Sequence, residues 1–167
     1  AKYGFGMKTI GYGKTIRGIS DLAAEGIDEY TTNLSEALQK ADYIVSVLPL
    51  TPETRGLLND KAFSSASKSN GGKCPVFINV GRGDIINETS ILNALDSKWI
   101  SAAILDVFEV EPLPQDSELW SRSDVVISPH VSGLTQSKDV PEVFLENYRR
   151  FVESRELKYI VDWEKGY

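Results

Sequence analysis

Four apolar runs of strand length recur along the chain, and they restrict the fold more than any other feature of the sequence. They read YIVSVL (43–48), PVFINV (75–80), AAILDV (102–107) and DVVIS (124–128). Their residues are mostly apolar in succession instead of alternating with polar ones, which is typical of parallel strands buried between helices. A shorter run of the same kind, Thr9–Tyr12, lies near the start of the chain.

Segments with helical spacing separate these runs. One has apolar residues at i, i+3, i+4 and i+7 from Leu34, and either Asn33 or Ser35 can cap it. Asn87 can cap a second helix. The longest helix is expected from about 138 to 153, with an apolar stripe of Phe144, Tyr148, Phe151 and Val152. Strand, helix and strand in repetition predict an α/β fold, a doubly wound parallel sheet with right-handed crossovers.

The composition is that of one globular domain, and it excludes several classes of partner. At 167 residues the chain is long enough for one ordinary domain. A net charge of −6 argues against nucleic acid and against an anionic membrane surface, since both need a basic face. No apolar run approaches the roughly 20 residues of a membrane span, and no signal peptide opens the chain, so we expect a cytoplasmic protein. We also expect no metal site.

Glycine-rich segments of the chain do not form a phosphate-binding motif. Gly4-Phe5-Gly6 begins like a dinucleotide fingerprint, but Thr9 stands where the third glycine belongs. Gly13-Lys14-Thr15 looks like the end of a P-loop, but Lys8 stands where its first glycine belongs. The stretch SSASKSNGGK (64–73) is expected to be a surface loop.

Three segments with reactive side chains follow strand-like runs, which is where ligands bind in this class of sheet. Arg82 lies between two glycines, and its planar guanidinium suits a carboxylate. Residues 106–114 carry three acidic side chains. His130 is the only histidine, and histidine suits proton transfer near neutral pH. Taken alone, each segment has an ordinary alternative: Arg82 could be an exposed loop residue, residues 106–114 a solvated acidic loop, and His130 a structural histidine. Together they suit the reduction of a 2-oxo acid.

Four ordered motifs resemble the D-2-hydroxyacid dehydrogenases. GRGDIINE (81–88), AAILDVFEVEPLP (102–114) and ISPHVSG (127–133) are similar to the signature segments of that family. VSVLPLTPETRGLLN (45–59) resembles the segment beside the adenosine half of the cofactor. The pair Leu119-Trp120 and the ending VDWEKGY are most similar to the glyoxylate/hydroxypyruvate reductase branch. The resemblance covers nearly the whole chain.

The resemblance implies a role for each of the reactive residues. Arg82 would bind and polarise the 2-oxo carboxylate of the substrate, and His130 would be the general acid in reduction. Glu111 would pair with His130 and keep its imidazolium charged. Asp106 would face the carboxamide of the cofactor. The other residues lining the cofactor would be Leu48, Pro49, Leu50, Thr51, Val80, Gly81, Ser132 and Gly133, together with Arg82 and His130.

The loop after Thr9–Tyr12 bears on the choice of cofactor. A preference for NAD calls for an acidic residue there, which accepts a hydrogen bond from the ribose 2′-hydroxyl. The sequence has Lys14, Thr15 and Arg17 instead. Two cations and a hydroxyl suit the 2′-phosphate, so we predict that NADP(H) is favoured over NAD(H). An ordinary basic surface turn is the alternative.

The sequence departs from the family pattern at its start. The family's domain opens with a strand and a glycine-rich turn that binds the pyrophosphate, and neither has a counterpart here. We therefore expect a Rossmann-like sheet that lacks its first strand and that turn, with exposed sheet edges. Residues 1–154 are expected to form a partial NAD(P)-binding domain, and residues 155–167 a tail that returns to a separate substrate domain. The chain alone is expected to turn over little.

Two functions remain open at this point. The first is NADPH-dependent reduction of glyoxylate or hydroxypyruvate, a small 2-oxo acid, by a homodimer. The alternative is a nucleotide-gated binding and dimerisation module similar to the corepressors related to these dehydrogenases, since those proteins resemble the same pattern of arginine, glutamate and histidine. The Leu119-Trp120 pair and the VDWEKGY ending favour the reductase.

Overall fold

The computed structural model describes residues 1–67, 74–133 and 136–164. The strands are β1 (Ile10–Tyr12), β2 (Glu29–Thr31), β3 (Tyr43–Ser46), β4 (Val76–Asn79), β5 (Ala102–Leu105) and β6 (Val125–Ile127). The α-helices are α1 (Lys2–Phe5), α2 (Ile19–Ala24), α3 (Leu34–Lys40), α4 (Asp60–Ser67), α5 (Glu88–Asp96) and α6 (Asp139–Val152). Two short 3-10 helices are η1 (Gly83–Ile85) and η2 (Glu118–Ser121).

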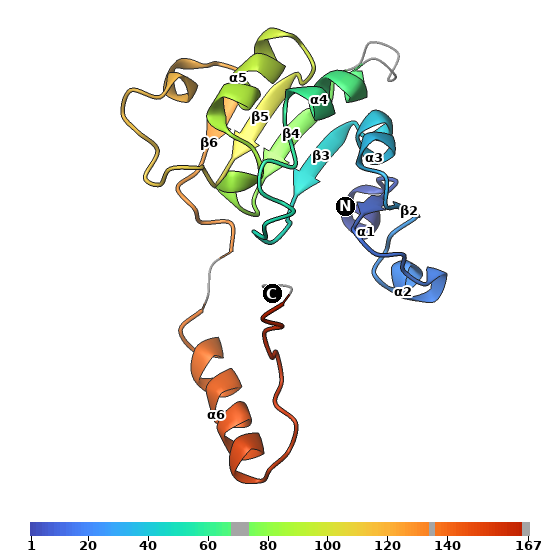
Figure 1. Ribbon diagram of the computed structural model, residues 1–167, viewed down its shortest axis with the longest axis vertical. Helices are drawn as coiled ribbons and strands as arrows, with labels where there is room; N and C mark the ends of the chain where they lie inside the picture. The colour runs from blue at the N-terminus through green and yellow to red at the C-terminus, as the bar shows by residue number, and fades with distance from the viewer. Residues whose placement is uncertain (68–73, 134–135, 165–167) are drawn as a thin grey trace.

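All of these strands pair in parallel, which confirms the predicted class of fold. They form a four-stranded sheet in the order β3-β4-β5-β6 and a separate two-stranded sheet of β1 and β2 (Figure 1). Within the described residues, β1 and β3 each pair with one strand only. Because neighbouring strands run in the same direction, the chain must return along the sheet between the end of one strand and the start of the next. Helices α4 and α5 lie in two of these connections, from β3 to β4 and from β4 to β5.

Side-chain caps fix the starts of two helices as the sequence predicts. The Asn33 side chain accepts a hydrogen bond from the Glu36 amide and so begins α3, which decides between the two candidate caps. The Asn87 side chain accepts one of 2.8 Å from the Ser90 amide and begins α5. Each cap satisfies an amide that has no partner within its own helix.

The hydrophobic core lies between one face of the four-stranded sheet and a layer formed by α3, α4 and α5. Ile44, Phe77 and Ala103 form a row across this face in the strand register, and all three are buried. The Phe77 ring meets that of Phe63 from α4 edge to face, with ring centroids 5.3 Å apart. α4 contacts both α3 and α5. The core therefore fixes the carboxyl ends of β3, β4 and β5 relative to these helices.

The opposite face of the sheet is less covered than the sequence suggests. Val45, Ile104 and Val126 belong to one row there and are 54%, 37% and 60% exposed. The expectation that these strands are buried on both faces is wrong for this row, because no helix of the described residues packs over it as α3, α4 and α5 do over the other face.

Two further features differ from the sequence prediction. The loop expected at 64–73 begins later, because Ser64–Ser67 belong to α4, and the rest of it lies outside the described residues. The short elements α2 and β2 were not predicted; β2 has the sequence Glu-Tyr-Thr, which carries no apolar run.

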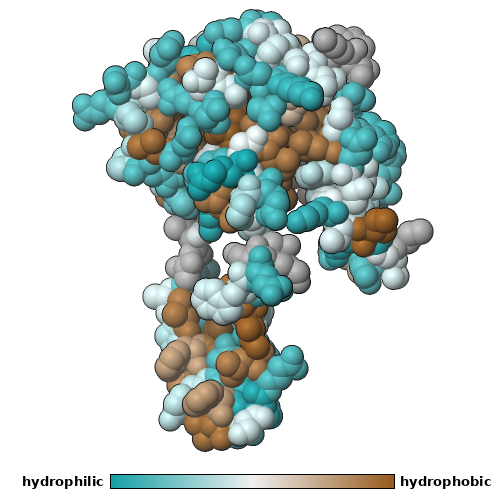
Figure 2. Space-filling view, in the orientation of Figure 1, coloured by the Kyte–Doolittle hydropathy of each residue, from teal (hydrophilic) through white to brown (hydrophobic). Residues whose placement is uncertain are grey.

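Helix α6 forms where its apolar stripe predicts, but it stands apart from the sheet (Figure 1). Phe144 and Phe151 of its stripe are 65% and 73% exposed. The segment after α6 folds back along it, because the Asn147 side chain exchanges two hydrogen bonds with the Lys158 backbone, at 2.8 and 3.1 Å. Figure 2 shows hydrophobic side chains on the surface of this unit. The division of the chain into 1–154 and 155–167 stays a prediction.

The packing of Phe77 gives a test of the core. Phe77→Ala should lower the free energy of unfolding by about 3–5 kcal/mol, because it removes a fully buried ring and leaves a cavity. Val126→Ala, on the exposed row, should change it by about 0.5 kcal/mol or less. Urea denaturation measures both, and equal effects of the two substitutions would contradict the assignment of the core to this face.

Candidate active site

The loops that follow β4, β5 and β6 leave the sheet side by side. Asn79, Leu105 and Ile127 end these strands and pair with one another in register. Parallel strands have their carboxyl ends at the same edge, so the loops begin at the same level. We name them the arginine loop (80–84), the acidic loop (106–114) and the histidine loop (128–133).

His130 and Glu111 form a polar pair at this edge. His130 Nδ1 lies 2.8 Å from Glu111 Oε2, and Glu111 Oε1 accepts a hydrogen bond of 2.9 Å from the Phe108 amide. Partial burial by itself raises the pKa of Glu111, but the hydrogen bonds from His130 and Phe108 outweigh it and hold the pKa below its ordinary value. An ionised carboxylate only accepts hydrogen bonds, so the hydrogen lies on Nδ1 and Nε2 faces away from the pair.

Asp106 connects the end of β5 to the histidine loop. Its side chain is 2% exposed, and its carboxylate accepts hydrogen bonds from the Ser128 hydroxyl at 2.5 Å and from the Val131 and Ser132 amides at 2.9 Å. Burial by itself raises the pKa of Asp106, but these hydrogen bonds outweigh it and hold the pKa well below its ordinary range. The group is therefore an ionised carboxylate enclosed by its own protein.

The arginine loop is folded around the buried side chain of Asn79. The Asn79 amide nitrogen donates to the Arg82 carbonyl at 3.1 Å, and its oxygen accepts from the Gly81 amide at 3.3 Å. The Arg82 guanidinium is exposed and donates to the Gly81 carbonyl at 2.7 Å. This side chain of β4 thus fixes the backbone from which Arg82 extends.

Gly83 brings the arginine loop and the acidic loop into contact. A Cβ atom on Gly83 would lie 1.9 Å from the carbonyl carbon and oxygen of Phe108, far inside van der Waals contact. Because the Phe108 amide is also bonded to Glu111, the backbone that touches Gly83 belongs to the segment that holds the carboxylate of the polar pair. Arg82, Glu111 and His130 are therefore carried by loops in direct contact.

The residues expected along the cofactor lie on the loops after β3 and β4. A Cβ on Gly81 would lie 3.1 Å from the Leu48 amide nitrogen, so these two loops touch where the arginine loop begins. The turn at Leu48–Thr51 is closed by Thr54, whose hydroxyl donates to the Pro49 carbonyl at 2.6 Å and accepts from the Thr51 amide at 2.8 Å. Val80 lies beside Gly81, and Ser132 and Gly133 end the histidine loop.

The basic residues expected at the 2′-phosphate lie on the two-stranded sheet, after β1. Arg17 donates to both carboxylate oxygens of Glu25, at 2.5 and 2.8 Å. Lys14 lies 3.4 Å from Glu53, which follows β3, and is 79% exposed. The Tyr30 hydroxyl donates to the Thr15 carbonyl at 2.7 Å. The structure thus places all three in the loop after β1 of the two-stranded sheet, whereas His130 follows β6 of the four-stranded sheet, and it pairs both cations with carboxylates.

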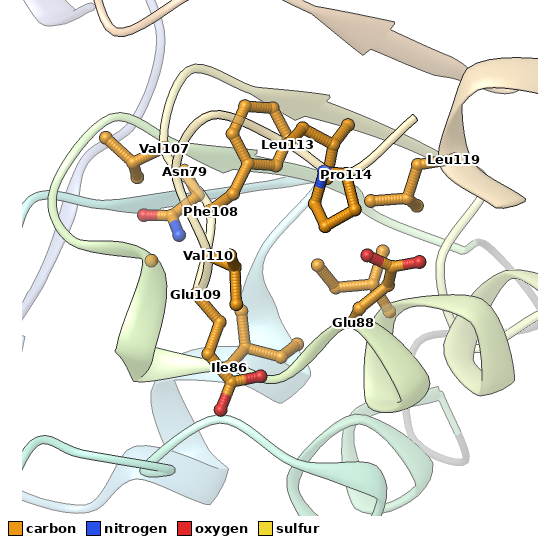
Figure 3. A pocket seen from close by; sticks show the side chains of 12 residues that line it. Asn79, Ile86, Glu88, Val107, Phe108, Glu109, Val110, Leu113, Pro114 and Leu119 are labelled. Atoms are coloured by element: carbon orange, nitrogen blue, oxygen red, sulfur yellow. The ribbon is translucent and has the colours of Figure 1, made fainter. Parts of the chain in front are cut away.

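A small cavity lies beside the arginine loop and the acidic loop (Figure 3). Its volume is about 60 Å³, and mostly apolar side chains line it, among them Ile86, Phe108 and Leu119. Ligand sites usually measure about 300–1,000 Å³, so it is too small for a substrate. The structure describes Arg82, Glu111 and His130, and none of them lines it. The chemistry of this edge therefore belongs to the open loops.

Sequence reasoning missed several residues that build the site. Asn79 and Ser128 bind the loops through their side chains, and Gly83 permits the contact between loops. A polar residue that ends an apolar strand, as Asn79 does in PVFINV, is a signal that could have identified it, since buried polar groups need partners. The contact at Gly83 has no such local signal.

Two classes of feature are absent from residues 1–67, 74–133 and 136–164. No helix there is long and apolar enough to cross a membrane. No group of three or more His, Cys, Asp and Glu side chains in the same ranges is placed to hold a metal ion.

Comparison with known proteins identifies one family over most of the chain. Residues 1–132 match the family described as D-isomer specific 2-hydroxyacid dehydrogenase, NAD binding domain. The chain is 42% identical over 113 residues to glyoxylate/hydroxypyruvate reductase B of Enterobacter sp. (strain 638), which is 68% of this chain and 33% of that protein. It is 37% identical over 135 residues to the same-named protein of Klebsiella pneumoniae, which is 81% of this chain and 39% of that protein.

Solved structures give the same result for the fold. An NADPH-dependent glyoxylate/hydroxypyruvate reductase from Sinorhizobium meliloti, in complex with NADP and sulfate, is 36% identical with a TM-score of 0.87, over 97% of this chain and 50% of that one. A D-isomer specific 2-hydroxyacid dehydrogenase from Xanthobacter autotrophicus Py2, in complex with NADPH, is 33% identical with a TM-score of 0.85, over 97% of this chain and 64% of that one. The chain thus spans about half the length of the reductase it matches.

The contact at Gly83 leads to a prediction. Gly83→Ala should lower the free energy of unfolding by roughly 1–3 kcal/mol, because the added methyl group meets backbone atoms that only a loop movement can clear. Gly4→Ala is the matched control, since a Cβ there meets nothing within 4 Å and alanine favours the helix. Urea denaturation compares the two. A Gly83 variant as stable as the Gly4 variant would contradict the contact.

Proposed function

The chain belongs to the D-isomer specific 2-hydroxyacid dehydrogenase family, and we propose that its Arg82, Glu111 and His130 serve the NADPH-dependent reduction of a small 2-oxo acid, glyoxylate or hydroxypyruvate. The observation that carries this proposal is the 2.8 Å contact between His130 and Glu111, whose acidic loop in turn touches the arginine loop at Gly83. The names of the reductases from Enterobacter and Sinorhizobium support the choice of substrate.

His130 supplies the proton in this reaction. Its Nδ1–H donates to Glu111, so Nε2 is the nitrogen that reaches a substrate oxygen. As an imidazolium, His130 gives the Nε2 proton to the carbonyl oxygen and becomes neutral, and that oxygen ends as a hydroxyl group because the carbonyl carbon would take a hydride from bound NADPH. The Glu111 carboxylate fixes the plane of the ring, because its second oxygen is held by the Phe108 amide.

Arg82 holds the other end of the substrate. Its side chain is exposed at the site, and a guanidinium binds a carboxylate through two parallel hydrogen bonds. Its backbone is fixed by Asn79, so the direction of approach is set by the sheet. Binding the carboxylate of a 2-oxo acid in this way presents the neighbouring carbonyl oxygen to the histidine loop.

The residues present fit nicotinamide adenine dinucleotide phosphate. The loops after β3 and β4 meet closely at Gly81, where a side chain would fill the space between them. The loop after β1 offers Lys14, Thr15 and Arg17, whose charges and hydroxyl suit a phosphate. NADPH, when bound, supplies the hydride. Structures of two relatives that contain NADP or NADPH support this choice of cofactor.

We also propose the homodimer and the cytoplasmic location that the resemblance and the sequence predict. Because the chain spans half the length of the Sinorhizobium reductase, the 167 residues alone should turn over little. Each assay is therefore run on this chain and, where the gene encodes further residues, on its full-length product.

Turnover is tested by following NADPH absorbance with glyoxylate and with hydroxypyruvate. His130→Asn should lower kcat by about 100-fold to 10,000-fold, because it removes the proton donor. Glu111→Gln should lower kcat less, since the histidine remains. Cofactor binding without turnover by the whole protein would contradict the reductase and would favour the nucleotide-gated binding module.

Cofactor preference is tested with the double variant Lys14→Ala/Arg17→Ala. It should raise the KM for NADPH about tenfold or more and leave the KM for NADH nearly unchanged, since each charge-assisted hydrogen bond contributes about 1.5–3 kcal/mol. Lys61→Ala, an exposed lysine on α4, is the control for loss of positive charge. An equal rise of KM for both cofactors would contradict a 2′-phosphate site at this loop.

A further inference from the structure

Asp106 binds the histidine loop on both sides of His130. Its carboxylate accepts hydrogen bonds from the Ser128 hydroxyl and from the amides of Val131 and Ser132. Its backbone carbonyl accepts one of 2.9 Å from the His130 amide itself. One buried residue at the end of β5 therefore fixes the loop before the histidine, at the histidine and after it.

The backbone at His130 needs such support. Its φ is +53°, in the left-handed region that a residue with a Cβ adopts only at a cost in energy. That conformation turns the next two amides, of Val131 and Ser132, toward one point, which makes a concavity for an anion. The anion in this structure is the Asp106 carboxylate, at 2.9 Å from both amide nitrogens.

The left-handed backbone decides where the imidazole lies. With the loop held in this conformation, Nδ1 of His130 reaches Glu111 at 2.8 Å. Released from it, the histidine loop would return to the more favourable negative φ, which swings the side chain away from its present direction. The contact between His130 and Glu111 therefore depends on a residue whose side chain bonds the Ser128 hydroxyl and the backbone of the loop, and not the imidazole.

We propose that Asp106 is a positioning residue for His130: its ionised carboxylate holds the left-handed backbone that directs the imidazole to Glu111. This rests on the proposed function of His130 as the proton donor. The resemblance assigns Asp106 to the carboxamide of the cofactor, whereas the structure directs both carboxylate oxygens at the histidine loop. A positioning residue acts on kcat, and a cofactor contact acts on the KM for NADPH, so the two roles can be separated.

Asp106→Asn is the informative substitution, because it keeps the size of the side chain and removes its charge. The side chain of asparagine accepts hydrogen bonds only through its oxygen. Its NH₂ group would therefore face one of the N–H or O–H donors of the histidine loop that the Asp106 carboxylate now accepts from. We expect kcat to fall about tenfold or more, because the proton donor is displaced. The KM for NADPH should change less than about threefold, since binding of the cofactor is retained.

A second readout does not depend on turnover. His130 is the only histidine of the 167 residues, so the ring ¹⁵N resonances of the labelled chain report on it alone, and His130→Asn verifies their assignment. In the wild type at a pH where the ring is neutral, they should show the hydrogen on Nδ1. Asp106→Asn should move these ring resonances to the ¹⁵N chemical shifts that they have in Glu111→Gln. Asp124→Asn, the same change at the other end of β6, should leave them unchanged.

The outcomes separate this inference from the proposed function. Ring resonances of Asp106→Asn identical to those of the wild type would overturn the positioning role, as would a raised KM for NADPH with unchanged kcat. If Asp106→Asn fails to fold, Ser128→Ala decides, because it removes one of the three hydrogen bonds to the carboxylate and should shift the same resonances in the same direction. Absence of turnover by the whole protein, wild type included, would contradict the reductase, and the ring spectrum of the chain would still decide the role of Asp106.

Discussion

The parallel register of β4, β5 and β6 determines the geometry of the candidate site. Asn79, Leu105 and Ile127 form one row, so three loops start about 4.8 Å apart from one strand to the next. Where the arginine loop meets Phe108, backbone lies against backbone, and only glycine fits at position 83. A shift of one residue in any strand would turn its alternate side chains to the other face and separate the loops. The core side chains that fix the register therefore also fix the distances at the site.

Buried polar groups at this edge link the core to the loops. Burial of a polar group costs free energy unless it is hydrogen-bonded. Asn79 and Asp106 lie at the ends of buried strands, and their side chains are satisfied by the backbone of the loops that follow. The loops are thus held by groups that would be costly to leave unpaired, which favours one loop conformation over its alternatives. Ser46 of β3 pairs with Asn79 in the strand register. Within the part of the chain that the structure describes, the Ser46 hydroxyl is buried and has no hydrogen-bond partner.

The sequence predicts the features that depend on neighbours along the chain. The five strand-like runs, the caps at Asn33 and Asn87 and the stripe of α6 are local patterns, and the structure contains each of them. The short strand β2 lacks an apolar run and was missed. The three loops could be located from the strands, and the pairing of Glu111 with His130 came from the resemblance. The contact at Gly83 and the hydrogen bonds of Asp106 join residues from different strands, and no local pattern indicates them.

The site consists of two parts that the structure supports separately. The polar pair and the arginine loop are fixed by contacts within β4, β5, β6 and their loops. The basic loop after β1 belongs to the other sheet, and the pair of Lys14 with Glu53 connects it to the turn after β3. An exposed ion pair of this kind contributes at most about 1 kcal/mol, and the packing that joins the two-stranded sheet to the core is made by α3, which contacts β1, β2 and α4. Substitutions that alter the choice of cofactor should therefore leave the position of His130 unchanged, and substitutions at Asp106 should leave cofactor preference unchanged. Proton transfer and cofactor selection can then vary independently in a protein built on this sheet.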